Sequence, residues 1–329
     1  MLTKTVTLPR PARAAGIILA TLLVGSLAAC TGDPPAISPG PTDPASPTPG
    51  GSPITSPSPD DRSPQPSPTA QPTIGQDGIE HPTGSTDVIL RMEQGGGFVP
   101  MGFMVTQAPE FTLYGDGTVL IKPLEDPDLP PGFDVAQPRF LQGHLDDETV
   151  QSLLEFALGQ GRLAVARDRY EDPMLADAST TIFTVNAGGI TKTVSVYALS
   201  EVVEPGRDAV DRAAFAELAE LLRSFEARAR GGELGEVVLY EPSHYRVTLM
   251  ESFGEQPGEP LAWPWDDVTP DDFAPTDEFN FPVAILTADD VAELTDVPSG
   301  GHPGIAVDYE GTTWMLGVRP LLPDEEPAG

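Results

Sequence analysis

The chain has 329 residues, with 50 acidic and 18 basic side chains and a formal net charge of −32 at pH 7. A surface of this charge repels phosphate backbones, so we expect no nucleic-acid partner. The single cysteine, Cys30, excludes an internal disulfide and a thiolate zinc site, so that an ordinary apolar core must stabilise the fold.

The first 29 residues have the parts of a bacterial export signal. Lys4, Arg10 and Arg13 form a basic start, and the 16 residues from Ala14 to Ala29 are uncharged. That length suits the apolar part of a signal peptide and is shorter than the roughly 20 residues of a stable membrane-spanning helix. We therefore predict that residues 1–29 are a signal peptide.

The signal ends in the order Leu-Ala-Ala-Cys over Leu27–Cys30, which is typical of a lipoprotein processing site. We expect cleavage before Cys30, attachment of diacylglycerol to its thiol, and acylation of the new amino group, for example with palmitate. Two or more acyl chains give stable anchoring, whereas one chain binds a membrane only marginally. The sequence thus predicts a protein held at the extracytoplasmic face of the cell membrane. An ordinary secretory signal with an incidental cysteine is the alternative.

Residues 30–85 are predicted to be a disordered tether. Of the 55 residues from Thr31 to Ser85, 15 are proline and 15 are serine or threonine. Apolar residues are too sparse here to offset the entropy of ordering the chain. A polyproline II conformation would reach about 170 Å when fully extended, and a flexible coil would span about 40 Å. Either length would hold a following domain away from the bilayer.

Residues 86–323 alternate short apolar runs with turn residues, and residues 324–329 form a short tail. This pattern predicts an acidic α+β domain of mainly antiparallel sheet with two to three helices. The run 111–121 predicts a hairpin with an Asp-Gly turn, and the run 181–199 a second hairpin with a Gly-Gly turn. Apolar residues at helical spacing predict the longest helix over residues 208–230.

Two segments of this domain are similar to each other. Val185–Leu199 aligns without gaps on Val307–Leu321, and a predicted helix precedes each segment, over 146–158 and 286–291. The likeness raises the hypothesis of a duplicated strand–helix–hairpin unit. Two unrelated hairpins that share composition for physical reasons are the alternative. The halves of a duplicated domain would be residues 86–200 and 233–323, joined by the helix over 208–230.

Common catalytic motifs are absent from the sequence. It contains no Gly-x-Ser-x-Gly, no His-Glu-x-x-His, no P-loop and no Ser-x-x-Lys. His144, His244 and His302 stand apart from one another, and we interpret them as surface residues rather than metal ligands. The sequence therefore favours a non-enzymatic domain. A hydrolase with an active site of scattered residues and an inhibitor-like module are the alternatives.

Two local features are candidate binding sites. Trp263-Pro264-Trp265 places two aromatic rings at a rigid turn, where they would contact a glycan or an envelope protein, or else fold back onto the core. Six carboxylates then follow within residues 266–278. Calcium prefers such oxygen ligands, but the spacing lacks the EF-hand order, and a solvated acidic loop is the alternative. The carboxylates belong to Asp266, Asp267, Asp271, Asp272, Asp277 and Glu278.

The signal, the tether and the acidic domain together resemble uncharacterised lipoproteins of high-GC Gram-positive bacteria. Within the domain, the resemblance is carried by Phe111–Gly117 and Arg319–Pro323. It implies lipid attachment at Cys30 and implies no activity. We therefore expect a lipid-anchored binding or interaction domain, with an envelope protein or a glycan as its partner.

Overall fold

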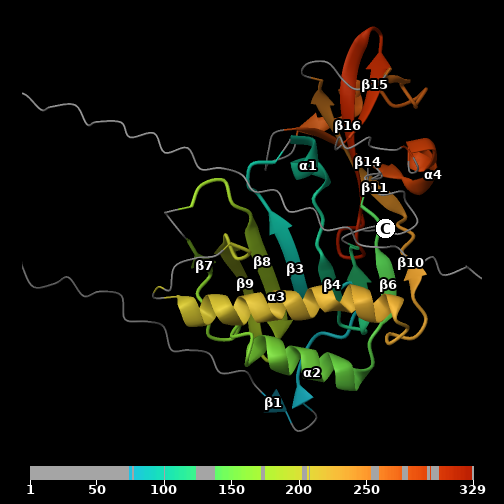
Figure 1. The fold of residues 1–329 in the computed structure, drawn as a ribbon. Helices are drawn as coiled ribbons and strands as arrows, with labels where there is room; N and C mark the ends of the chain where they lie inside the picture. Colours follow the sequence, from blue (N-terminus) through green and yellow to red (C-terminus); the bar gives the residue numbers. More distant parts are fainter. Residues whose placement is uncertain are drawn as a thin grey trace, which may run out of the picture. The chain divides into compact units, whose positions relative to one another are not determined.

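The computed structural model describes one α+β domain of mainly antiparallel sheet, as predicted (Figure 1). The predicted signal peptide, Cys30 and most of the predicted tether lie outside the described residues. In the described part, no helix is long and apolar enough to cross a membrane. The described residues are 74–75, 78–99, 101–123, 138–171, 175–201, 206, 208–252, 259–275, 281–294, 297 and 304–327.

The first sheet has eight strands in the order β10-β6-β5-β4-β3-β8-β9-β7, and β7 alone runs parallel to its neighbour. The hairpins β4–β5 and β8–β9 confirm the two predicted turns, which place Gly117, Gly188 and Gly189 at positive φ. The strands are β3 (Val88–Gly95), β4 (Phe111–Tyr114), β5 (Thr118–Ile121), β6 (Leu141–His144), β7 (Arg169–Tyr170), β8 (Thr180–Ala187), β9 (Ile190–Tyr197) and β10 (Val238–Leu239).

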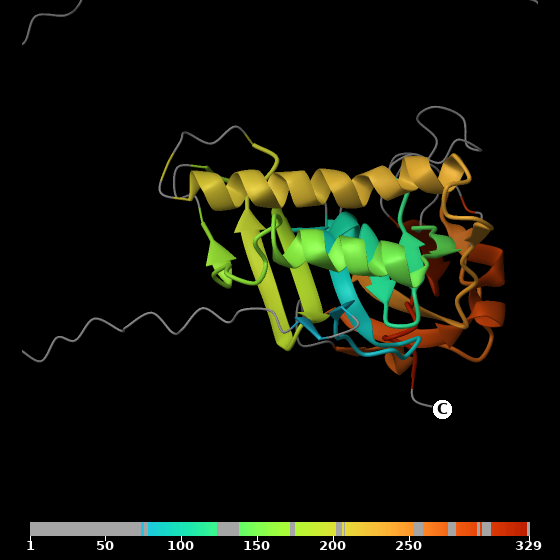
Figure 2. The same cartoon turned by 90° about the horizontal axis from the view of Figure 1, so that it is seen from below.

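Two helices, α2 (Asp147–Leu158) and α3 (Ala209–Arg230), cover one face of the first sheet (Figure 2). Their bounds agree with the predicted helices over 146–158 and 208–230. The Asp146 side chain caps α2 by accepting a hydrogen bond from the amide of Thr149. Alternate strand residues and the apolar stripes of both helices form the larger core of the domain.

The second sheet has the strand order β12-β15-β16-β11-β14-β13. Its own core lies on the side of α4 and of two 3-10 turns. The short helix α1 (Met101–Thr106), which the sequence analysis missed, packs on β16. The elements are β11 (His244–Glu251), β12 (Leu261–Ala262), β13 (Ala274–Pro275), β14 (Pro282–Thr287), β15 (Ile305–Tyr309), β16 (Thr312–Pro320), α4 (Ala288–Val291), and the 3-10 turns Pro270–Asp272 and Ala292–Leu294.

The described fold begins before the predicted domain boundary at residue 86. A small strand pair, β1 (Ile74–Gly75) with β2 (Gly78–Ile79), precedes the first sheet. Ile79 is buried in the larger core, and the Gln151 side chain on α2 hydrogen-bonds both its amide and its carbonyl. A single apolar residue that docks on a helix is invisible to a prediction based on the composition of a long window.

The structure does not show the hypothetical duplication. The hairpins β8–β9 and β15–β16 do share their register around a two-residue turn. However, β8, the first strand of its hairpin, joins β3 at the centre of its sheet, whereas β16, the second strand of its hairpin, joins β11. The similar sequences therefore reflect the shared requirements of a tight hairpin rather than a repeated topology.

The predicted division into halves also differs from the structure. The helix α3 packs into the core of the first sheet, and β10 follows it in the chain. Strand β10 then pairs with β6 and completes the first sheet. The first sheet therefore takes up residues 238–239, which the prediction had assigned to the second half, and α3 covers this sheet rather than joining two halves.

The core beneath α3 gives a stability prediction. Phe215 is fully buried, with its ring centroid 4.9 Å from that of Tyr170 in an edge-on contact. We expect Phe215→Ala to lower the free energy of unfolding by about 3–5 kcal/mol, because it removes buried area and leaves a cavity. Val210, on the same helix, is 69% exposed. Val210→Ala is the matched control, with an expected change within about 0.5 kcal/mol in urea unfolding. Equal effects of the two substitutions would contradict this account of the core.

Candidate functional site

The face of the first sheet opposite α2 and α3 borders a pocket of about 780 Å³. Strands β3, β7, β8 and β9 supply one side of the pocket, α1 supplies its rim, and β11, β14 and β16 of the second sheet supply the other side. The lining combines apolar groups with three arginines and three glutamates. The charged lining residues are Arg169, Arg246, Arg319, Glu93, Glu171 and Glu325.

The second sheet presents its two arginines to the pocket because of its strand register. Arg246 on β11 and Arg319 on β16 are direct cross-strand partners. Such partners project from the same face of a sheet. Their neighbours in the chain, Val247 and Val318, project to the other face and are fully buried in the core of the second sheet. Period-two alternation therefore separates the apolar core from the charged pocket.

The helix α1 approaches this charged face at Gly317. A Cβ atom at that position would lie 2.5 Å from Cγ2 of Val105, so a larger residue there would push α1 away. Arg246 donates a hydrogen bond from Nη2 to the carbonyl of Val105, over 3.2 Å. The rim of the pocket is thus fixed to the second sheet by close packing and by one of the pocket arginines.

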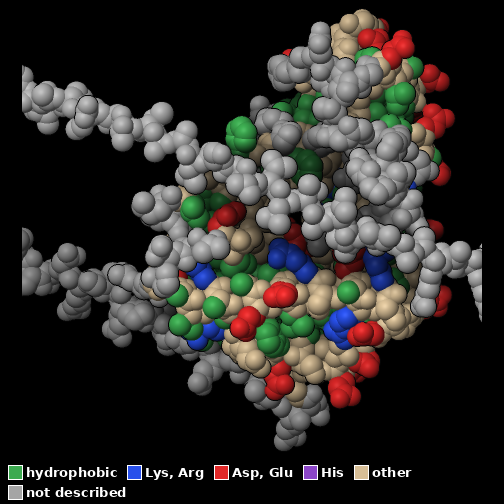
Figure 3. Space-filling model, viewed as in Figure 1, with side chains coloured by type: hydrophobic (Ala, Val, Ile, Leu, Met, Phe, Trp, Pro, Cys, Tyr) green, Lys and Arg blue, Asp and Glu red, His purple; other side chains and the backbone are tan. Residues whose placement is uncertain are grey.

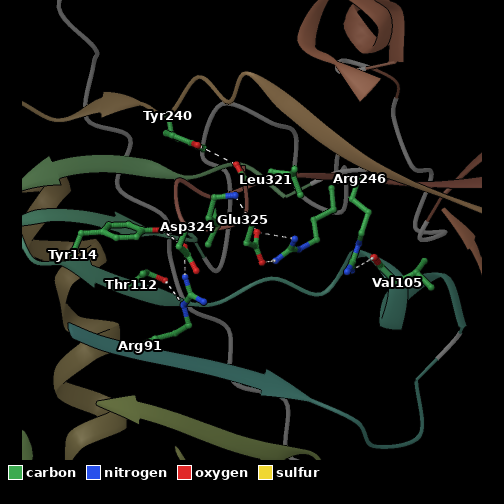
Figure 4. A network of polar contacts seen from close by, with 11 residues as sticks. Arg91, Val105, Thr112, Tyr114, Tyr240, Arg246, Leu321, Asp324 and Glu325 are labelled. Atoms are coloured by element: carbon green, nitrogen blue, oxygen red, sulfur yellow. Dashed lines mark hydrogen bonds and ion pairs between the residues drawn. The ribbon is translucent and has the colours of Figure 1, made fainter. Parts of the chain in front are cut away.

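The segment that follows β16 runs between the two sheets (Figure 4). Leu322 is fully buried and packs with Tyr114, Leu120 and Phe140 on the pocket-side face of the first sheet. The Tyr240 hydroxyl donates to the carbonyl of Leu321, over 3.0 Å. The end of the chain is therefore part of the domain.

Asp324 joins this segment to the first sheet. One oxygen, Oδ1, accepts hydrogen bonds from Nη2 of Arg91 at 2.6 Å and from the hydroxyl of Tyr114 at 2.7 Å. Nε of Arg91 donates to Thr112, its cross-strand partner. Burial and the neighbouring Asp324 charge raise the pKa of Tyr114, so its hydroxyl stays protonated and remains a donor.

The next two carboxylates join the segment to the second sheet. Glu325 accepts two hydrogen bonds from Arg319, at 2.9 and 2.7 Å, in a two-point contact. Glu326 lies 2.6 Å from Nδ1 of His244. Burial opposes the charge of Glu326, but hydrogen bonds from Ser243 and His244 outweigh burial and hold its pKa below the ordinary value. We call Asp324, Glu325 and Glu326 the C-terminal clasp.

The clasp corrects the prediction that residues 324–329 are a tail. An acidic run without apolar residues resembles a solvated tail, because sequence patterns do not reveal the partners of a charge. Here each clasp carboxylate meets a basic side chain, and all of these partners lie far from the run or across a turn. The only available signal was the preceding Leu321-Leu322 pair, which marked a segment able to dock.

The two tryptophans of the predicted contact site pack onto the core of the second sheet. Trp265 is buried and donates Nε1–H to the carbonyl of Asp290, while Trp263 donates to the carbonyl of Val268. Their rings meet edge-on, with centroids 5.2 Å apart, and Phe273 lies against both. The Trp-Pro-Trp turn therefore folds back onto the core, which agrees with the second of the two interpretations of this turn.

The described carboxylates of the acidic loop either cap a local turn or are exposed, and they do not form a common binding site. Asp272 caps its own 3-10 turn by accepting hydrogen bonds from Thr269, and Asp266 and Asp267 are exposed. Asp277 and Glu278 lie outside the described residues. Within the described ranges, no group of three or more His, Cys, Asp or Glu side chains could hold a metal ion.

One Ser–His–Glu cluster has the residue types of a hydrolase. Ser243 and Glu326 both contact the same ring nitrogen of His244, Nδ1, at 3.1 and 2.6 Å. A nucleophile and an orienting carboxylate must instead use opposite nitrogens, so that the ring can take a proton from one while the other holds it in place. This cluster therefore serves the clasp and lacks the arrangement of a catalytic triad.

The face that carries α3 shows how charge is distributed. The Lys and Arg side chains visible there lie mostly around α3, next to Asp and Glu side chains, and further Asp and Glu side chains lie at the outer margin near α4 (Figure 3). Comparisons with known proteins add no assignment, since no family model, no curated protein and no solved structure matches this chain.

The clasp gives a second stability prediction. Asp324→Asn keeps the size of the side chain but removes the charge that pairs with Arg91, whose side chain is 14% exposed. We expect a loss of about 2–4 kcal/mol in the free energy of unfolding, because the Arg91 charge is left without its counterion in a largely buried place. The control is Asp267→Asn, at an exposed position. Urea unfolding of both variants provides the measurement, and a loss below 0.5 kcal/mol for Asp324→Asn (about the size of an ordinary surface change) would contradict the role of the clasp.

Proposed function

We propose that this protein is a lipid-anchored binding domain at the extracytoplasmic face of the cell membrane, with its ligand in the pocket between the two sheets. The observation that carries the proposal is the pocket itself. Its volume of about 780 Å³ lies within the range of roughly 300–1,000 Å³ found for small-molecule sites. Hydroxyl groups of Thr180 and Ser195 stand among apolar lining residues and can orient a ligand.

The anchoring part of the proposal is supported by the sequence. The uncharged stretch that ends in Leu-Ala-Ala-Cys favours processing at Cys30, and a lipid on that thiol would hold the chain at the membrane. The proline-rich residues after Cys30 would then display the domain at a distance from the bilayer. A displayed pocket suits the capture of a solute or of a group on a neighbouring envelope molecule.

The state of the pocket carboxylates favours binding over catalysis. Glu325 accepts from both terminal nitrogens of Arg319 and from the amide of Leu322. These three donors already occupy both oxygens of the carboxylate, which leaves it little capacity to contact a substrate. Glu171, which directly follows β7, lies 3.5 Å from Arg169 on the same side of the pocket. These pairs support a preformed recognition surface.

The first test concerns the anchor. Cys30→Ser in the full chain should abolish labelling by an alkyne-tagged palmitate in growing cells and move the protein from the membrane fraction to the soluble fraction. The domain should remain folded, since Cys30 is remote in sequence from every strand of the two large sheets. The matched control is Ser38→Ala in the predicted tether, which should leave labelling unchanged. Continued lipidation of Cys30→Ser would overturn the anchoring proposal.

The second test concerns the pocket. Ser195 lines it from β9, and a tryptophan there would fill much of the space. Phenylphosphate, benzoate, benzylamine and glucose serve as probes of four chemical classes in thermal unfolding of the full chain. A ligand that binds only the folded state raises the unfolding midpoint. At least one probe should do so for the native sequence and not for Ser195→Trp.

The control for the pocket test is Thr193→Trp. Thr193 is exposed, lies two residues away on the same strand, and is not among the residues that line the pocket. Its tryptophan variant should respond to the probes as the native chain does. The proposal fails if no probe raises the unfolding midpoint, or if Ser195→Trp responds as strongly as the native sequence.

A further inference from the structure

The charge of the pocket departs from that of the domain around it. From Thr86 onward the sequence has 44 acidic and 14 basic residues, yet the pocket gathers three arginines with three glutamates. If the basic side chains were distributed at random among so many acidic ones, most pockets on the surface would carry a net negative charge. The structure instead concentrates arginines where a small molecule can enter.

Two of these arginines stand directly against each other. Arg246 and Arg319 are cross-strand partners, so their Cβ atoms lie about 5 Å apart on one face of the sheet. Like charges in such a position repel each other and destabilise a sheet. Glu325 binds both terminal nitrogens of Arg319 and places a negative charge beside the pair. An anion placed between the Arg246 and Arg319 side chains would also reduce the repulsion between them.

Arg319 also has a donor without an acceptor in the described part of the chain. Its side chain is only 6% exposed. Its Nε atom is buried and has no hydrogen-bond partner among the described residues. A buried donor without an acceptor costs about 1–3 kcal/mol. Since Arg319 lines the pocket, an anionic oxygen bound there would supply the acceptor that this atom lacks.

The remaining lining fits a compact organic molecule. Val105, Ile182 and Val283 supply apolar contacts next to the arginine pair. Arg169, whose side chain is 75% exposed and lies 3.5 Å from Glu171, stands at the opposite side of the pocket. The Thr248 side chain, on the same face of β11 as Arg246, adds a neutral hydroxyl.

We infer that the ligand of this pocket is a small organic anion, with a carboxylate or phosphate group bound between Arg246 and Arg319 and a short apolar body against Val105, Ile182 and Val283. This inference rests on the proposed function of the same pocket. Guanidinium groups bind both kinds of anion through paired hydrogen bonds, so the two arginines account for either group.

The experiment compares probes of one shape and different charge on the full chain by isothermal titration calorimetry. Phenylphosphate and benzoate are the anionic probes, and benzamide is the neutral analogue of benzoate. At least one anion should bind about tenfold or more tightly than benzamide, which is the size expected for hydrogen bonds to a charged group. Titration between pH 5 and 7 separates the two anions. Only the phosphate ester gains charge in that range, with its second pKa near 6.

Two variants test the arginine pair. Arg246→Gln should weaken binding of the better anion about tenfold or more. Arg319→Gln combined with Glu325→Gln should do the same. Glu325→Gln is included because Arg319→Gln alone would leave the Glu325 carboxylate buried without its counterion. The control is Arg228→Gln on α3, outside the pocket and paired with Glu233, which should leave affinity unchanged. Thermal unfolding of each variant shows whether it is folded.

The outcomes separate this inference from the proposed function. If benzamide binds as tightly as the anions, or if Arg246→Gln leaves anion affinity unchanged while Ser195→Trp abolishes it, the pocket binds ligands but the anion assignment is wrong. If neither anion binds the native chain, the inference is overturned. Binding of benzylamine or glucose in that case would leave the pocket itself as the ligand site.

Discussion

The two large sheets share no hydrogen-bonded strand pair among the described residues, and they are joined by the segment that runs between them and by the packing of α1 on β16. The C-terminal clasp supplies the polar part of that connection. Asp324 accepts from Arg91 and Tyr114 on the first sheet, and Glu325 accepts from Arg319 on the second. Each carboxylate alone would be costly to bury, and each is matched by a partner of opposite charge or by a hydroxyl donor. The apolar part comes from the leucine before the clasp, which packs on the first sheet.

The position of the pocket depends on where the C-terminal segment lies between the sheets. The C-terminal segment covers the β4–β5 side of the first sheet, and the β8–β9 side faces the pocket. One clasp residue, Glu325, also lines the pocket and pairs with Arg319 there. Stability and recognition therefore share a residue. A change at Glu325 would therefore affect both its pairing with Arg319 and the lining of the pocket.

Local sequence patterns predicted the local structure well. The Asp-Gly and Gly-Gly turns and both long helices are all present, because each depends on residues close together in the chain. The pocket was not predicted. Arg246 and Arg319 are 73 positions apart in the printed sequence and meet only through the register of β11 and β16. Composition likewise marked the clasp as a tail, and sequence similarity between hairpins suggested a duplication that the strand order does not show. The pocket, the clasp and the strand order all depend on pairing between residues that are far apart in the sequence. No single segment determines that pairing.

The most direct measurement of the central claim is the ¹⁵N–¹H spectrum of the arginine Nε groups during titration with phenylphosphate and with benzoate. The Nε–H signal of Arg319 should shift and exchange more slowly with water as the better anion binds, because that atom gains an acceptor. The Nε–H signal of Arg91 already has Thr112 as its acceptor and should stay in place. Binding of an anion with an unchanged Arg319 signal would contradict the account, since the anion would then lie elsewhere.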